Sequence, residues 1–172
     1  MTAGPAGPAG PAGPAGPAGP AGPSATAGEP ARSDDNRVVV RRYYDEVWNG
    51  LNLEVVDELV AADYQPGGRD GEKRLITGAH ASFPDIRFTI DDLMAAEGDS
   101  VIIRWTAQGT HRGKFRGIAP TGAEVSWSGI SIYRLAGGRL VAGWSRSDQL
   151  GLLQQLGATV ALPKAPPADA TT

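Results

Sequence analysis

The fold is decided by TAQGTHRGKFRGIAPTGAEVSWSGISIYRLAGGRLVAGWSRSDQLG, residues Thr106–Gly151. Segments rich in β-branched and aromatic residues predict strands over Val101–His111, Glu124–Leu135 and Arg139–Ser147. The Gly137-Gly138 pair between the last two is typical of a two-residue hairpin turn. We therefore expect three consecutive antiparallel strands, and we expect any functional site to be built on the sheet that they form.

Working outward, the remaining segments predict mostly helices. Apolar residues at i, i+3 and i+4 spacing, among them Val40 and Tyr44, indicate a buried helix face. Glycines and Pro66 predict a loop over Asp63–Gly71, and Ile86, Phe88 and Ile90 alternate with polar residues as in a half-buried strand. The expected helices are Asp34–Asn49, Leu53–Ala61, Glu72–Ser82 and Asp148–Leu156. Three helices, with a short strand possible among them, are followed by four antiparallel strands and a terminal helix. This order makes an α+β protein with helices on one face of a curved sheet.

Composition limits what the 172-residue chain can do. The net charge is −3 and the basic residues are scattered, which argues against a nucleic-acid partner. The absence of cysteine excludes disulfides, thiolate nucleophiles and zinc–thiolate sites. No apolar run approaches the roughly 20 residues of a membrane helix, and a signal-peptide pattern is missing. We expect a soluble cytoplasmic protein with no membrane partner.

The two ends of the chain differ in composition from its centre. Residues 4–21 repeat the triplet Gly-Pro-Ala, and the last residues are rich in proline and alanine. These few triplets are too short for a collagen triple helix, and such sequences bury almost no apolar surface. We expect disordered tails over residues 1–32 and 159–172 and one folded domain over residues 33–158.

Residues 36–157 resemble the SnoaL-like polyketide cyclase or ester cyclase family of the NTF2-like superfamily. The matching segments run in order from the first predicted helix to the last: Arg41-Arg42-Tyr43-Tyr44 through Trp48-Asn49, Asp63-Tyr64, Ala81-Ser82-Phe83-Pro84-Asp85, Arg104-Trp105, Gly109-Thr110-His111-Arg112-Gly113, Pro120-Thr121-Gly122, Tyr133-Arg134, Trp144, and Asp148 with Gly151 to Gly157. The resemblance implies a cone that encloses one apolar pocket, and often a homodimer formed through the outer sheet face. It also implies ring closure by intramolecular aldol condensation without a metal or organic cofactor.

Some positions depart from the family pattern. The aspartate that acts as acid and base on the last strand of the aldol cyclases is replaced by Ser145, and polar helpers on the preceding strand fall at Gly129 and Ser131. A serine hydroxyl cannot do the proton transfer of a carboxylate near neutral pH without an activating base. This argues against the standard aldol mechanism, and it leaves open whether a carboxylate from elsewhere, such as Asp91, Asp92 or Glu124, enters the pocket.

Two residues that remain from the family pattern are candidate catalytic groups. An imidazole has an unperturbed pKa near 6.5, so a histidine such as His111 is a candidate general acid or base, although a turn histidine bonded to the backbone is an alternative. Asp148 can orient such a group, although at the start of the last helix it can also serve as an N-cap. His80 has no second ligand nearby in sequence, so we expect no metal site.

Six further residues are candidates for substrate binding. Tyr44 and Trp48 lie one turn apart on the first helix, and the period-2 rule places Trp127, Ser131 and Ser145 on the inward face of the sheet. Small residues framed by aromatics suit a flat or polycyclic ligand, although the aromatics can also be core. The sixth candidate is Arg104, which can reach a substrate oxygen or pair with Asp91 or Asp92.

These observations predict a cofactor-independent cyclase of lyase or isomerase type, acting on a hydrophobic, polyketide-derived or similar intermediate. In this hypothesis the cone orders a flexible substrate, so that proximity supplies much of the rate. Two alternatives remain open. One is a ligand-binding cone without catalysis, and the other is a cofactor-free monooxygenase or epoxide-opening hydrolase.

Overall fold

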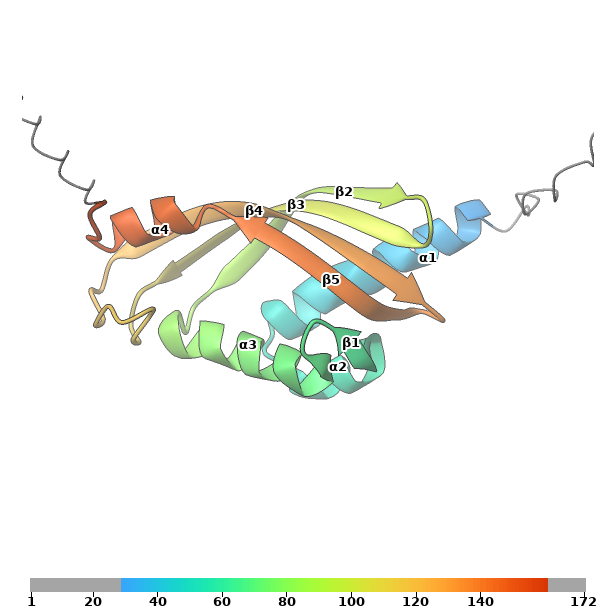
Figure 1. Cartoon of the computed structure of the whole chain (residues 1–172), viewed down its shortest axis with the longest axis horizontal. Helices are drawn as coiled ribbons and strands as arrows, with labels where there is room; N and C mark the ends of the chain where they lie inside the picture. The colour runs from blue at the N-terminus through green and yellow to red at the C-terminus, as the bar shows by residue number, and fades with distance from the viewer. Residues whose placement is uncertain (1–28, 161–172) are drawn as a thin grey trace, which may run out of the picture.

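The computed structural model describes residues 29–160, and most of the two predicted tails lies outside them. The elements are, in chain order, α1 (Glu29–Arg42), η1 (Tyr43–Trp48), α2 (Leu53–Leu59), β1 (Val60–Gln65), α3 (Gly68–Ser82), β2 (Arg87–Ala96), β3 (Ser100–Thr110), β4 (Glu124–Ala136), β5 (Arg139–Ser147) and α4 (Gln149–Gln155). No helix in this part of the chain is long and apolar enough to cross a membrane. The expected α+β architecture with a curved sheet is confirmed (Figure 1).

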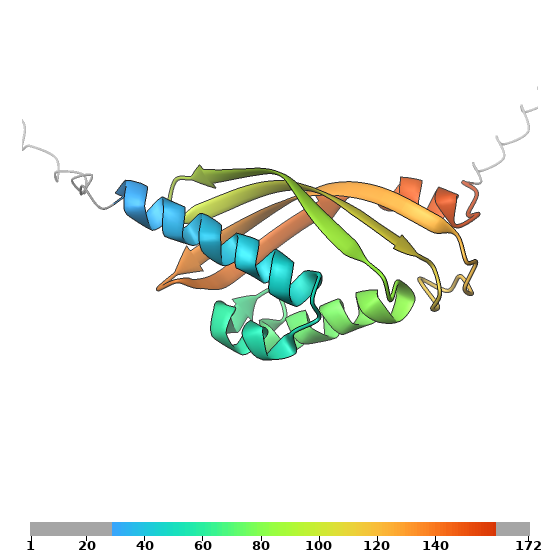
Figure 2. The ribbon, with the colours of Figure 1, turned by 180° about the vertical axis from the view of Figure 1, so that it is seen from behind.

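The strands form one sheet in the order β1-β5-β4-β3-β2. Strands β2 to β5 pair antiparallel with their neighbours, as the turn signals predict, and β1 adds to β5 in parallel. The helices α2 and α3 lie below the concave face of this sheet, and α1 runs obliquely along it (Figures 1 and 2). The space between sheet and helices holds the apolar core.

Strand β4 shows strict alternation along its length. Trp127, Ser131 and Tyr133 are buried on the concave face, while Ile130 and Ile132 are exposed on the convex face. Neighbours in register share these faces, because side chains directly opposite one another on paired strands point the same way. The predicted inward positions of Trp127 and Ser131 on β4 are confirmed.

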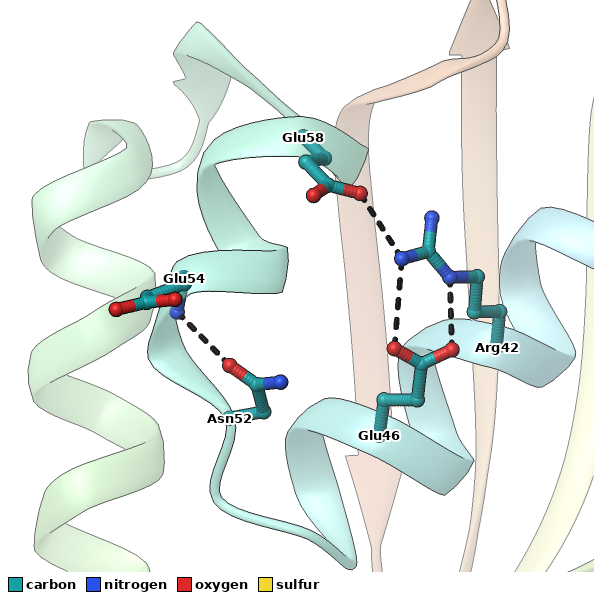
Figure 3. Close-up of polar contacts among 5 residues, drawn as sticks. All are labelled: Arg42, Glu46, Asn52, Glu54 and Glu58. Carbon is teal, nitrogen blue, oxygen red and sulfur yellow. Dashed lines mark hydrogen bonds and ion pairs between the residues drawn. The ribbon is translucent and has the colours of Figure 1, made fainter.

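The segment η1 carries the two aromatics that the helical spacing places together. Tyr44 and Trp48 are both buried against the sheet. Arg42, just before η1, bonds Glu46 at 2.7 Å and Glu58 of α2 at 2.9 Å (Figure 3). The side chain of Asn52 caps α2 by accepting from the amide of Glu54 at 3.2 Å (Figure 3). These contacts fix the turn from η1 into α2.

Three predicted boundaries were wrong. Helix α1 begins at Glu29 rather than Asp34. Residues from Val60 form strand β1, not the end of a helix and a loop, because the edge of β5 offers backbone partners that outweigh the weak local preference. Helix α3 begins at Gly68 rather than Glu72. Its early turn is supported by Asp70 near the positive end of the helix dipole, and by Arg69, which donates to the carbonyl of Val60 at 2.8 Å.

Asn49 ties the end of η1 to the edge strand β2. Its Nδ2 donates to the carbonyl of Phe88 at 2.9 Å, and its Oδ1 accepts from the amide of Phe88 at 2.7 Å. The Asn49 side chain thus bonds the backbone of Phe88 as a neighbouring strand would. Strand β2 needs such a partner because it is an edge strand of the sheet that the described residues form.

We predict that Asn49→Ala lowers the free energy of unfolding by about 2 kcal/mol, because two partly buried backbone groups of Phe88 lose their partner. Urea denaturation followed by circular dichroism measures the effect. The control is Asn52→Ala, which removes an exposed helix cap and costs about 1 kcal/mol. An equal or smaller loss for Asn49→Ala would contradict the assigned role.

Candidate active site

A cavity of about 820 Å³ lies between the concave face of the sheet and the segments η1 and α3. This volume falls within the range of small-molecule sites. Its lining comes from every layer of the fold and includes Tyr44 and Trp48 of η1, Tyr64 of β1, Glu72, Leu75 and Ala79 of α3, Phe88 of β2, Trp105 of β3, Trp127, Ser131 and Tyr133 of β4, Gly143 and Ser145 of β5, and Phe115 and Arg116 of the loop after β3. The cavity is therefore the one expected inside the cone.

Aromatic rings form a continuous wall on one side of the cavity. Tyr44 stacks on Trp48 with centroids 6.5 Å apart, Trp48 contacts Phe88 at 4.9 Å, and Phe88 contacts Trp105 at 5.2 Å. Each of these rings lines the cavity. Flat aromatic faces and edges pack well against a planar ligand.

A directed chain of hydrogen bonds crosses the sheet side of the cavity. The indole N–H of Trp105 donates to Ser131 Oγ at 2.9 Å, and the Ser131 hydroxyl donates to Ser145 Oγ at 3.0 Å. The Ser145 hydroxyl accepts this bond, and its own proton has no acceptor among residues 29–160. Because Ser145 lines the cavity and is exposed, this wall presents a hydrogen-bond donor.

Two glycines make room for this arrangement. A Cβ at Gly143 would overlap the hydroxyl of Tyr64, and a Cβ at Gly129 would lie 2.8 Å from Cε2 of Trp105. The missing side chains let Tyr64 and Trp105 pack directly on the sheet.

The helical side of the cavity carries a buried carboxyl. Glu72 of α3 is only 8% exposed, and its Oε1 accepts a hydrogen bond from the phenol of the fully buried Tyr43. Its other oxygen, Oε2, has no hydrogen-bond partner among the described residues and is not enclosed, and Glu72 is one of the residues that line the cavity. Burial raises the pKa of Glu72 above its usual range, and the Tyr43 hydrogen bond offsets part of this rise.

Tyrosine hydroxyls complete the polar lining. Tyr44 and Tyr133 share a hydrogen bond of 2.9 Å between their hydroxyls. Burial raises the pKa of Tyr44 to about 12 and also raises the pKa values of Tyr64 and Tyr133. These phenols are therefore neutral near pH 7 and can act as hydrogen-bond donors.

The sequence itself matches one protein family over nearly the whole of the described domain. The model of the SnoaL-like polyketide cyclase family covers residues 38–156. The chain belongs to the SnoaL-like polyketide cyclase family. The resemblance noted from the sequence motifs is thereby confirmed, and no curated protein matched the sequence.

Solved structures agree with this family assignment. A candidate polyketide cyclase from Acidithiobacillus ferrooxidans is 31% identical, with a TM-score of 0.65 over 72% of this chain and 94% of its own. IdmH, a candidate polyketide cyclase from Streptomyces antibioticus, is 30% identical, with a TM-score of 0.64 over 72% of this chain and 99% of its own. AclR, a candidate hydroxylase from Streptomyces galilaeus, is 27% identical, with a TM-score of 0.66 over 77% and 91%.

The structure brings most of the candidate substrate-binding residues together. Tyr44, Trp48, Trp127, Ser131 and Ser145 all line the cavity. Arg104 lies elsewhere, half-exposed on the convex face. There it pairs with Asp91 at 3.1 Å and with Asp92 at 2.7 Å.

His111 lies outside the lining, although it is fully buried. Its ring packs on Phe83 at 5.4 Å, and its Nδ1 accepts from the amide of Thr121 at 3.2 Å. Because Nδ1 is the acceptor, the ring proton sits on Nε2, which has no partner among the described residues. These contacts tie the end of β3 to the turn before β4.

Asp148 also lies outside the lining. It is exposed, and its Oδ1 accepts from the amide of Gly151 at 2.8 Å as the N-cap of α4. Among residues 29–160 no group of three or more His, Asp or Glu side chains is arranged to hold a metal ion.

Glu72 was missed in the sequence because α3 was expected to begin there, next to a glycine-rich loop. The signal that identifies it is helical spacing. Glu72 lies four residues before the buried Ile76 and so shares its inward face. A carboxyl on the apolar face of an amphipathic helix is unusual unless it has a partner.

We predict that Glu72→Gln raises thermal stability at pH 8. The pKa of Glu72 is raised in the folded state, so its stabilising contribution is complete below the usual value of 4.5 and is lost as pH rises through the folded-state pKa. Glutamine still accepts from Tyr43 but carries no charge to bury. We expect a melting temperature several degrees above wild type at pH 8, with the difference disappearing near pH 4.5.

The measurement is differential scanning calorimetry across this pH range. Glu54→Gln, at an exposed position on α2, serves as the matched control and should show no such pH-dependent gain. A Glu72→Gln variant less stable than wild type at both pH values would contradict the assignment.

Proposed function

We propose that this protein is a cyclase that closes a ring in a hydrophobic, flat, polyketide-derived intermediate. The observation that carries the proposal is the cavity of about 820 Å³, whose lining combines aromatic rings with the hydroxyl groups of Tyr44, Tyr133, Ser131 and Ser145. The family and the similarity to the candidate cyclases support the same class of reaction. The reaction is of the lyase or isomerase type, since closing a ring within one molecule needs no second substrate.

In this proposal the cavity acts first by shape. The stacked rings of Tyr44, Trp48 and Phe88 hold the planar part of the substrate and bring its flexible chain within reach of the reacting carbon. The free proton of Ser145, oriented through Ser131 and Trp105, binds a carbonyl oxygen and stabilises the negative charge that develops there. His111 and Asp148 then contribute by fixing the loop after β3 and the start of α4.

One neighbour favours a second candidate function. AclR is a candidate hydroxylase, and this chain is 27% identical to it. A hydroxylase of this type would insert oxygen into a substrate of similar shape. The cyclase and the hydroxylase would therefore use the same cavity, but only the hydroxylase would consume oxygen.

We predict that the protein binds and converts a tricyclic anthraquinone carrying a β-keto ester side chain. Binding should quench the fluorescence of Trp48, Trp105 and Trp127, which line the cavity, and mass spectrometry should detect the ring-closed product. Ser145→Phe should fill the cavity and weaken binding about tenfold or more.

Ser128→Phe is the matched control, since Ser128 is exposed on the convex face of the same sheet. Equal binding by Ser145→Phe and wild type would overturn the proposal, as would the absence of quenching by the anthraquinone. Oxygen uptake during conversion would assign the hydroxylase function instead, and quenching without conversion would leave a ligand-binding protein.

We further propose a homodimer formed through the convex face of the sheet. Three large apolar side chains are exposed there, Ile130 at 52%, Ile132 at 40% and Trp144 at 49%, and Ile132 pairs with Trp144 across β4 and β5. Adjacent exposed apolar residues of this size are typical of an interaction surface.

We predict that Ile132→Lys produces a monomer in sedimentation-velocity experiments. A charged side chain in this apolar patch would have to be buried in the dimer interface, which costs free energy. Val38→Lys is the control, since Val38 is also an exposed apolar residue, at 64%, but lies on α1. A wild-type protein that is monomeric at high concentration would refute the dimer.

A further inference from the structure

The resemblance to the aldol cyclases implies an acid/base aspartate at the position that Ser145 holds in this chain, so a carboxyl group for this role would have to come from elsewhere in the cavity lining. Among the residues that line the cavity in the described part of the chain, Glu72 is the one with a carboxyl group. The carboxylates left open by the sequence lie elsewhere. Asp91 and Asp92 pair with Arg104 on the convex face, and Glu124 is exposed at the start of β4.

Glu72 lies among the tyrosines of the chain and is hydrogen-bonded to one of them, Tyr43. The chain contains four tyrosines, and three of them, Tyr43, Tyr44 and Tyr64, lie close enough to Glu72 for its charge to affect their pKa values. The fourth, Tyr133, packs edge-on against the ring of Tyr43 at 5.8 Å. Because Tyr43 is fully buried, its hydrogen bond holds Oε1 of Glu72 and leaves Oε2 without a partner in the described part of the chain.

A purely structural role explains only part of this geometry. A hydrogen-bond acceptor for Tyr43 needs one oxygen, and a neutral side chain such as glutamine would supply it without the cost of burying an ionisable group. The unpartnered Oε2 of a largely buried carboxyl that lines the cavity is therefore the feature that points to chemistry. A carboxylate with few water neighbours is a stronger base than one in solution.

We propose that Glu72 is the catalytic acid and base of this protein and that Tyr43 is its positioning residue. The proposal rests on the proposed ring-closing function and adds to it the group that moves the proton. The carboxylate of Glu72 takes a proton from a carbon next to a substrate carbonyl. The resulting enolate carbon bonds to a second carbonyl carbon of the same molecule, and the new alkoxide takes the proton back from Glu72. Atoms and charge balance without an oxidant or reductant.

The location differs from the one that the resemblance to the aldol cyclases implies. The carboxyl is on the helical wall, on α3, while the family position on the last strand holds Ser145, a donor. The enolate oxygen can thus be stabilised from the sheet while the base works from the helix, so that acceptor and donor lie on different walls of the cavity.

The test uses nitrobenzisoxazole, a small flat aromatic that reports proton abstraction from carbon. A base removes its C–H proton, the N–O bond breaks, and a coloured phenolate with a nitrile group forms. We expect wild-type protein to accelerate this reaction over acetate buffer and Glu72→Gln to lose about a hundredfold or more of that acceleration. Glu54→Gln, on the exposed face of α2, should retain all of it.

Tyr43→Phe gives a readout that a structural role would not produce. The ionisable groups facing Glu72 are Tyr43, Tyr44 and Tyr64, which remain neutral near pH 7, so the rate should rise with pH as Glu72 ionises. The Tyr43 hydrogen bond lowers the pKa of Glu72, and its removal should move the midpoint of the pH–rate profile to higher pH.

The outcomes separate the two proposals. Loss of the nitrobenzisoxazole reaction in Glu72→Gln, with circular dichroism unchanged, supports the role of Glu72 even if the anthraquinone is neither bound nor converted. Retention of that reaction in Glu72→Gln, or a wild-type rate no higher than that of buffer, overturns the role of Glu72 even if the anthraquinone is converted. If the pH–rate profile of Tyr43→Phe has the same midpoint as that of wild type, the positioning role of Tyr43 is wrong.

Discussion

The alternation of side chains along β4 is the constraint on which the rest of the molecule depends. Strands β3 and β5 pair with β4 on either side, so its register decides which of their residues face the helices. A slip of one residue would place Ile130 and Ile132 in the cavity and move Ser131 and Tyr133 into solvent. The aromatic wall, the donor chain and the convex apolar patch therefore all follow from a single register.

The sequence predicted the parts of the fold that have strong local signals. Strand β5 was placed correctly because Gly137-Gly138 marks its start, and the inward set of β4 follows directly from period 2. A short strand among the first helices was expected only as a possibility and was not placed, because β1 forms only where the edge of β5 offers backbone partners, which no local pattern reveals. The true start of α3 was missed because two glycines resemble a loop, although Asp70 and Arg69 support the first turn.

In the candidate site too, the sequence predicted the residues whose positions follow from local periodicity and not those that depend on tertiary contacts. Tyr44, Trp48 and Trp127 could be placed on the cavity because helical and strand periods orient their side chains. His111 could not, since the end of a strand leaves both faces possible, and the turn at Thr121 decides the matter. Glu72 became evident only when α3 was seen to pack opposite the sheet, since its partner Tyr43 is distant in sequence and lies in η1.

The chain of donors from Trp105 through Ser131 to Ser145 has a direction, and this has a consequence for stereochemistry. A fixed donor on one wall and a carboxyl on another make the cavity polar along a defined axis. We expect an unsymmetrical ligand to enter in one orientation, because turning it end for end would set its carbonyl oxygen against Glu72. The face of the carbonyl that is attacked, and hence the handedness of the product, would then be fixed before any bond forms.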